Sequence, residues 1–92
     1  MKVRIYGTLR AVMGGVKETE VHVSGPSTAG EMLAQLVAAY PALRPKVLRG
    51  ENELQGGVGL LVNGRSTRFL QGLDTPVREG DEVALFPPIG GG

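Results

Sequence analysis

The chain has 92 residues, a length typical of a single domain. Its 10 basic and 9 acidic residues leave a net charge of +1, so the whole chain carries no strong field for nucleic acid or for an anionic membrane. It contains no cysteine. This excludes disulfides, thiolate metal sites and a thiol nucleophile.

The first quarter of the chain has the pattern of a β-hairpin. Residues 2–6 alternate polar and apolar, Gly14-Gly15 offers a turn, and residues 20–23 alternate again. No signal-peptide pattern precedes the first strand, and no apolar run approaches the roughly 20 residues that span a bilayer. We therefore expect a soluble cytoplasmic protein with no membrane partner.

The next segment has the pattern of an amphipathic helix. Thr28 followed by Glu31 fits a capping box, and Pro41 marks the end of the helix. The apolar residues between them fall on one stripe at helical spacing, namely Ala29, Met32, Leu33, Leu36, Val37 and Tyr40. This stripe predicts a helix that packs one face against a core.

Residues 42–57 leave two interpretations open. Leu43, Val47 and Leu48 fit a short helical turn, whereas residues 51–57 have the composition of a loop.

The last part of the chain alternates strands with turns. Residues 58–62 are an apolar run closed by Asn63-Gly64, a strong hairpin signal, and residues 65–69 fit a short return strand. Residues 82–86 fit a last strand, which ends at Pro87-Pro88 because proline has no N–H for a ladder. Turns are expected between these strands at residues 74–76 and 79–81.

The resulting order is β-β-α-β-β, with one main helix covering one face of a mixed sheet. This is an α+β arrangement, and the ubiquitin-like β-grasp fold has this order. A right-handed crossover through the helix is expected to place the third strand parallel to the first. We assign residues 1–88 to the β-grasp domain and residues 89–92 to a flexible glycine tail.

The sequence offers no constellation of catalytic groups. His22 is the only histidine, it lies in a predicted strand facing solvent, and it has no metal-ligand spacing around it. The carboxylates are scattered, and the weak basic cluster of Arg44, Lys46 and Arg49 lacks the interleaved aromatics of a nucleic-acid platform. We expect no catalysis by this chain alone, no bound metal or cofactor, and no nucleic-acid partner.

The glycine tail is the feature of the sequence that calls for a functional explanation. Gly90, Gly91 and Gly92 follow Ile89 directly after the last strand, without a polar linker. Glycine has no Cβ, so these residues can thread a slot too narrow for any side chain. An unhindered glycine carboxyl also suits activation as an acyl-adenylate and attack by a nucleophile.

The run from Phe69 to Pro88, FLQGLDTPVREGDEVALFPP, with Gly91-Gly92 at the end and Val62-Asn63-Gly64 before it, resembles the MoaD/ThiS-type sulfur carriers, which include the small subunit of molybdopterin synthase. The resemblance covers essentially the whole chain. Gly90 stands where many members have alanine, and the loop at residues 42–57 is longer than in the shortest carriers.

The resemblance implies a chemistry for the tail. An E1-like adenylating enzyme would activate the Gly92 carboxylate with its own ATP and magnesium. A sulfur donor such as a cysteine desulfurase or a rhodanese would then form a thiocarboxylate on Gly92, and Gly91 would let it pass into a partner. In molybdopterin synthase the acceptor is a pterin precursor held by the large subunit, so this chain would be the sulfur-donating subunit of a transferase.

The body should also bind a partner, because ordering each tail residue costs about 1–2 kcal/mol and glycine gains little contact in return. Strand parity points nine residues at the helix, namely Val3, Ile5, Val21, Val23, Val58, Leu60, Val62, Val83 and Leu85. The same parity leaves Tyr6, Leu61 and Phe86 outward on neighbouring strands as an apolar docking patch, with Pro87, Ile89 and Gly90 beside it. The alternative is that a bulge flips the parity or that a loop covers one of them.

Three functional alternatives stay open beside a carrier for molybdopterin. The first is a sulfur carrier for cysteine, thiamine or tRNA thiolation, which would use the same tail. The second is a ubiquitin-like modifier conjugated through Gly92 to lysines. The third is an interaction domain whose tail has no role.

Overall fold

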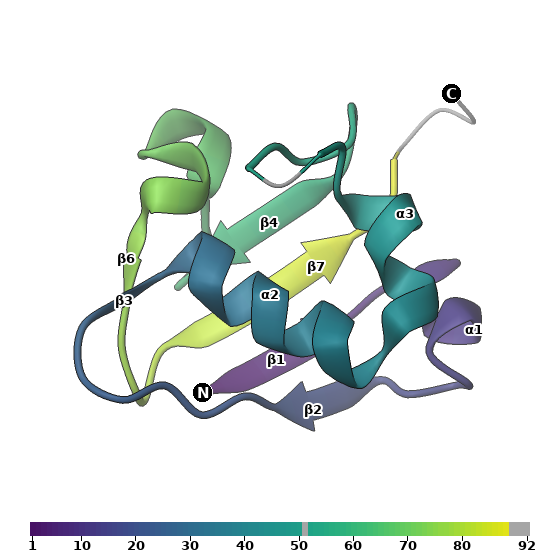
Figure 1. Cartoon of the computed structure of the whole chain (residues 1–92), viewed down its shortest axis with the longest axis horizontal. Helices are drawn as coiled ribbons and strands as arrows, with labels where there is room; N and C mark the ends of the chain where they lie inside the picture. Colours follow the sequence, from purple (N-terminus) through teal and green to yellow (C-terminus); the bar gives the residue numbers. More distant parts are fainter. Residues whose placement is uncertain (51, 89–92) are drawn as a thin grey trace.

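The computed structural model describes residues 1–50 and 52–88, which form a five-stranded sheet crossed on one face by a single main helix (Figure 1). The strands lie in the order β2-β1-β7-β4-β5. Their bounds are Lys2–Ile5 for β1, Glu18–Glu20 for β2, Gly59–Val62 for β4, Arg65–Ser66 for β5 and Glu82–Phe86 for β7. The predicted α+β, β-grasp architecture is confirmed.

The strand parallel to β1 is the last strand and not the third, so that part of the prediction was wrong. β1 pairs with β7 in parallel, from Lys2 opposite Glu82 to Ile5 opposite Leu85. β4 pairs with β7 antiparallel and therefore runs opposite to β1. The connection through the main helix leads to β4, which does not pair with β1. The position between β1 and β4 is taken by β7, the last strand of the chain.

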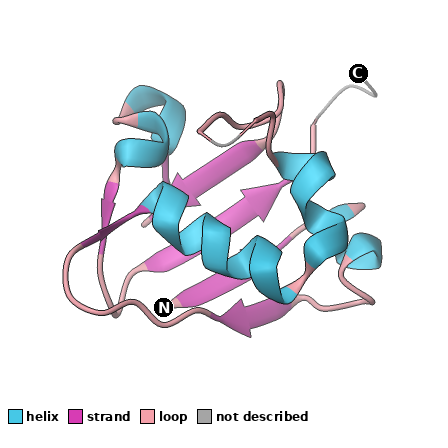
Figure 2. Cartoon of the chain, in the orientation of Figure 1, coloured by secondary structure: helices cyan, strands magenta, loops and turns pink. Residues whose placement is uncertain are grey.

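The main helix α2 (Ala29–Ala39) begins and ends where the sequence predicts (Figure 2). The Thr28 hydroxyl accepts from the Glu31 N–H at 3.1 Å, and the Glu31 carboxylate accepts from the Thr28 N–H at 3.1 Å, which completes the capping box. Five residues of the predicted stripe are buried, and Tyr40 packs partly buried against the core. None of the helices in residues 1–50 and 52–88 is long and apolar enough to cross a bilayer.

The core confirms the predicted inward face. All nine residues assigned to it by parity are buried, and none exceeds 8% exposure. They pack with the buried residues of α2 in one continuous cluster.

The segment between the first two strands differs from the predicted hairpin. A short helix α1 (Leu9–Val12) follows β1, and Leu9 and Met13 are buried beneath it. The turn at Gly14-Gly15 is confirmed, with φ of 73° and 91°. The second strand covers Glu18–Glu20 and not residues 20–23.

The reason for this shift lies beyond the sheet. The Val23 N–H donates to the Glu79 carboxylate at 2.8 Å and not to a neighbouring strand, so the chain leaves the ladder. Val21 and Val23 stay buried all the same.

The ambiguous middle segment contains both a helical part and a loop. A 3-10 turn η1 (Pro41–Leu43) leads into the short helix α3 (Arg44–Val47), and Leu43, Val47 and Leu48 are buried as the first interpretation requires. Leu48 then forms an isolated bridge with Leu54.

The second half adds two features that the sequence pattern did not predict. Asn63 and Gly64 take φ of 50° and 81° as a hairpin turn needs, but the return strand β5 stops at Ser66. The Ser66 hydroxyl accepts from the Arg68 N–H and begins the 3-10 turn η2 (Thr67–Phe69), which η3 (Gly72–Asp74) follows. A small second sheet then pairs β6 (Pro76–Val77) with β3 (Ser27–Thr28).

Candidate functional site

The four tail residues predicted to carry the function, Ile89, Gly90, Gly91 and Gly92, lie outside the described residues. The structure describes the point from which they leave, which is Pro87-Pro88 at the end of β7. The contacts of these two prolines with the rest of the domain fix the point from which the tail leaves.

Pro87 packs directly on the backbone of Gly7. A Cβ on Gly7 would lie 2.7 Å from Cγ of Pro87, closer than real Cβ contacts, and Gly7 has a φ of +58° that disfavours other residues. Only glycine therefore allows this approach. Gly7 joins β1 to α1, so the seat of Pro87 is made by the first loop of the chain.

Pro88 packs on a second glycine from another part of the chain. A Cβ on Gly57, whose φ is +84°, would lie 3.0 Å from Cβ of Pro88. The base of the tail is thus held between the loop after β1 and the loop before β4. Neither contact was predicted from the sequence, because nothing local in the sequence shows that a proline approaches these glycines.

Tyr6 and Phe86, two of the residues predicted to form a docking patch, lie side by side at the same end of the sheet. The Tyr6 and Phe86 rings are stacked, with centroids 4.4 Å apart and planes 7° apart. The Tyr6 N–H donates to the Leu85 carbonyl, which continues the pairing of β1 with β7 and fixes the two rings side by side. Both side chains are half-buried, on the face opposite α2.

Leu61 extends the patch across β4. Gly59 lies opposite Phe86 in the register, and a Cβ on Gly59 would meet Phe86 at 3.4 Å and Leu61 at 3.9 Å. Leu61 lies opposite Ala84 and shares a shallow surface hollow with Tyr6. The pairing of β4 with β7 is continuous from Gly59 to Val62, so no bulge reverses the parity there. We call Tyr6, Gly59, Leu61, Ala84 and Phe86 the docking patch.

Arg10 supports this patch and was not predicted. Its Nε donates to the Ile5 carbonyl at 2.7 Å, and its guanidinium carbon lies 5.5 Å from the centroid of the Tyr6 ring. The second distance is within the range of a cation–π contact. Arg10 belongs to α1, and the sequence pattern gave no sign of that helix.

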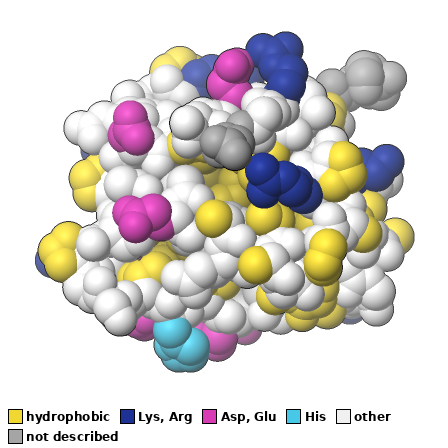
Figure 3. Space-filling view, viewed as in Figure 1, with side chains coloured by type: hydrophobic (Ala, Val, Ile, Leu, Met, Phe, Trp, Pro, Cys, Tyr) yellow, Lys and Arg dark blue, Asp and Glu magenta, His cyan; other side chains and the backbone are white. Residues whose placement is uncertain are grey.

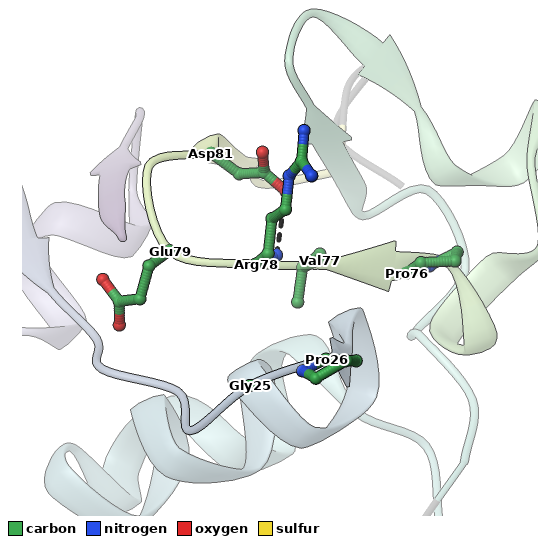
Figure 4. A pocket seen from close by; sticks show the side chains of 7 residues that line it. All are labelled: Gly25, Pro26, Pro76, Val77, Arg78, Glu79 and Asp81. Carbon is green, nitrogen blue, oxygen red and sulfur yellow. Dashed lines mark hydrogen bonds between the residues drawn. The ribbon is translucent and has the colours of Figure 1, made fainter.

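The end of the sheet away from the tail has a structural role. A hollow of about 660 Å³ is lined there by Gly25, Pro26, Pro76, Val77, Arg78, Glu79 and Asp81 (Figure 4). Its two carboxylates are engaged by the backbone: Glu79 accepts from the Val23 N–H, and Asp81 accepts from the Arg78 N–H at 3.0 Å.

Glu79 also fixes the start of the chain. The hydrogen bond from Val23 and the Met1 ammonium at 3.1 Å hold the pKa of Glu79 below its ordinary value of 4.5. Burial lowers the pKa of the Met1 ammonium, but its contacts with Glu79 and Glu20 outweigh burial and the net direction is upward. His22 is exposed as predicted and lies 3.6 Å from Glu79. This arrangement ties Met1 and Val23 to the turn that leads into β7.

The chain matches the ThiS family over residues 3–92. It belongs to this family of ubiquitin-like sulfur carriers. The match includes both the docking patch and the three glycines of the tail.

Curated relatives of this ThiS-family chain include both modifiers and carriers. It is 36% identical to small archaeal modifier protein 1 of Haloferax volcanii over 92 residues, which cover 100% of both chains. Over 86 residues it is 33% identical to the sulfur carrier protein CysO of Mycobacterium tuberculosis, with 91% of this chain and 89% of CysO covered. It is 30% identical to the molybdopterin synthase sulfur carrier subunit of the same species, with 100% and 96% covered.

Solved structures agree with the fold and the family. The crystal structure of small archaeal modifier protein 1 from Haloferax volcanii superposes with a TM-score of 0.84 at 35% identity, covering 99% of this chain and 97% of the other. The BexX/CysO complex of Amycolatopsis orientalis gives a TM-score of 0.84 at 26% identity, covering 99% and 98%. The second structure shows that a relative of this ThiS-family chain forms a complex with another protein.

Proposed function

We propose that this chain carries sulfur as a thiocarboxylate on Gly92. The Gly92 carboxylate attacks the α-phosphate of ATP in an E1-like adenylating enzyme, and pyrophosphate leaves. A persulfide on a cysteine desulfurase or a rhodanese then attacks the acyl carbon, and AMP leaves. A thiol next attacks the donor sulfur of the resulting acyl persulfide, which releases the Gly92 thiocarboxylate and leaves the donor cysteine in a disulfide with that thiol. ATP and magnesium belong to the activating enzyme, and this chain supplies only the carboxyl group.

The observation that supports this function best is the seating of the tail base on two glycines. Pro87 against Gly7 and Pro88 against Gly57 fix the point where the chain leaves the sheet. Residues 89–92 then reach about 13 Å beyond it when extended. A fixed base with a short, narrow extension suits delivery of a carboxyl group into a pocket of another protein.

The docking patch supplies the affinity that the tail lacks. Threading Gly90, Gly91 and Gly92 costs several kcal/mol, at about 1–2 kcal/mol for each ordered residue. Stacked aromatics at the centre of an interface are the side chains that most often repay such a cost. Tyr6 and Phe86 therefore dock on the activating enzyme and on the sulfur acceptor, with Leu61, Pro87 and Ile89 beside them.

The first acceptor to test is the large subunit of molybdopterin synthase, where this chain would act as the small subunit in molybdenum cofactor biosynthesis. The similarity to a molybdopterin synthase sulfur carrier subunit supports this assignment. The similarity to CysO supports cysteine synthesis as an alternative, and the same tail would serve thiamine synthesis or tRNA thiolation. All of these reactions would take place in the cytoplasm.

A second candidate function is protein modification. The full-length similarity to small archaeal modifier protein 1 favours it. The same adenylate would then be attacked by a lysine amine of a target protein, which would form an amide with Gly92 and release AMP. Lys2, Lys17 and Lys46 are the only lysines available for attachment of one copy to another.

The activation step can be tested with the E1-like adenylating enzyme of the same host. ATP–pyrophosphate exchange should start when this chain is added. It should fall to background with a variant that lacks Gly91 and Gly92, while that variant keeps the circular dichroism spectrum of the parent. Equal exchange with both proteins would overturn the proposal, because activation would then not need the tail.

A further inference from the structure

Several basic side chains lie on the elements that surround the tail base. In the view of Figure 3, most Lys and Arg side chains lie toward the top and the right, with one carboxylate among them at the top and one basic side chain at the left edge. The C-terminal end of β7 points to the right in the same orientation (Figure 1).

Two of the basic residues lie at the end of β1, and one of them, Arg10, reaches the tail base through Gly7. The Arg10 N–H donates to the carbonyl of Gly7, the residue on which Pro87 packs. The Arg10 side chain and the Lys17 carbonyl both bind the backbone of Ile5, at 2.7 Å and 2.9 Å. Arg10 therefore lies beside the end of β1, next to Pro87, and Lys17 lies across the same end of β1 on the side of β2.

Two others reach it through the loop that holds Pro88. Gln55 donates from its side chain to the Pro45 carbonyl and from its backbone to the Val47 carbonyl, which ties this loop to α3. The same loop contains Gly57, the seat of Pro88. Arg44 and Lys46 lie on α3 and are exposed, so they flank the tail base from this second side.

We call Arg10, Lys17, Arg44 and Lys46 the basic collar. Within residues 1–50 and 52–88, no carboxylate lies within 4.0 Å of any of the four. Other cations are paired: Arg49 with Glu53 at 2.9 Å, and Arg4 with Glu18 at 3.6 Å. Among the described residues, the collar cations therefore have no ion-pair partner.

The opposite end of the sheet carries several carboxylates. Glu20 and Glu82 are both register partners of Lys2, at the start of β1 and therefore one strand length from Tyr6. Glu79 and Asp81 lie in the turn that leads into β7. Lys2, Arg65 and Arg78 lie at the same end, so charges of both signs meet there.

We propose that the basic collar docks on an acidic rim around the tail slot of the activating enzyme and orients the chain tail-first during approach. This inference rests on the proposed function, since it assigns a partner to the same tail. Complementary charge of this kind raises association rates by factors of 10 to 10³ and leaves dissociation rates less affected. The effect is lost as salt shortens the Debye length, from about 30 Å at 0.01 M to about 3 Å at 1 M.

The test compares two triple variants of equal net charge. The collar variant carries Lys17→Glu, Arg44→Glu and Lys46→Glu, and it keeps Arg10 because Arg10 supports Tyr6. The control variant carries Arg65→Glu, Arg68→Glu and Arg78→Glu, which are also exposed and, among the described residues, also have no carboxylate within 4.0 Å. Association and dissociation rates are measured with the host's E1-like adenylating enzyme, without ATP, at low and high salt.

The collar variant should associate on the order of tenfold to hundredfold more slowly than the parent at low salt, and the difference should vanish near 1 M salt. The control variant should slow association by no more than a few-fold. Equal slowing by both variants would overturn the proposal, because net charge alone would explain it. If the parent protein does not support ATP–pyrophosphate exchange, the proposed function is wrong. The association rates of the two variants would still test the role of the basic collar in binding.

Discussion

Tyr6 and Phe86 stack face to face across the parallel pair of β1 and β7, with ring centroids 4.4 Å apart. Phe86 is also the last residue of β7, directly before the two prolines that begin the tail. One side chain therefore joins the docking patch to the tail base. A partner that binds the stack is placed next to the tail.

Replacing Phe86 should separate binding from folding. Phe86→Ala removes half of the stack, and we expect binding to the activating enzyme to weaken about tenfold or more, as for a central aromatic at an interface. Phe69→Ala is the matched control, because Phe69 is 84% exposed on η2 and lies outside the patch. Titration calorimetry of both variants measures the difference. The patch is wrongly assigned if the two variants bind equally well.

The seat of Pro87 predicts an unusual cost for a small substitution. Gly7→Ala would place a methyl group 2.7 Å from Pro87 in addition to straining a φ of +58°. Gly14→Ala has a similar φ, +73°, but no atom within 4 Å. We expect about 1–2 kcal/mol of strain in both, and about 1–3 kcal/mol more for Gly7→Ala from overpacking.

Urea denaturation of the two glycine variants gives this difference in the free energy of unfolding. Gly7→Ala should also slow activation of Gly92 more than Gly14→Ala does, because it displaces the base of the tail. Equal stability of the two variants would mean that Pro87 does not depend on Gly7.

The contacts of Glu79 predict an acid-dependent loss of stability. Its pKa is lowered by the Val23 N–H and the Met1 ammonium, so the unfolded chain takes up a proton before the folded chain does. The resulting stabilisation is complete above pH 4.5 and declines as pH falls through the lowered pKa. Glu79→Gln should lower the melting temperature at neutral pH and flatten its fall below pH 4.5. A fall as steep as that of the parent would assign the acid sensitivity to other carboxylates.

The capping box of α2 predicts a moderate effect on stability alone. Thr28→Ala removes the acceptor for the Glu31 N–H and should lower the free energy of unfolding by about 0.5–2 kcal/mol. Ser24→Ala, at an exposed position before β3, should change it by less than about 0.5 kcal/mol. Neither variant should change activation of Gly92 at a temperature where both are folded.

The features that the sequence predicted correctly are those encoded by local pattern. The Thr28 and Glu31 pair marked the start of α2, Asn63-Gly64 marked the hairpin, and alternation separated the inward valines from Tyr6, Leu61 and Phe86. These signals depend on periods of 3.6 and 2 residues and on turn chemistry. They survive in the fold because the core buries the same faces that the pattern defines.

The features that the sequence did not reveal depend on contacts between distant segments. The approach of Pro87 to Gly7 joins positions 80 residues apart, and the strand at 20–23 was shortened because Val23 binds Glu79. The direction of the third strand was predicted wrongly for the same reason, since the insertion of β7 between β1 and β4 depends on tertiary packing. The basic collar likewise becomes visible only when α1 and α3 are placed beside the end of β7.

The most direct test of the central claim is the intact mass of this chain after incubation with its activating enzyme, magnesium ATP and a sulfur donor, with and without a thiol-alkylating reagent. The chain has no cysteine, so rapid alkylation reports a thiocarboxylate. Oxidation of any of the three methionines adds mass without creating an alkylatable group. We expect an oxygen-to-sulfur exchange that alkylates and that maps to Gly92. An unmodified carboxylate under these conditions, with the enzyme shown to be active, would contradict the account.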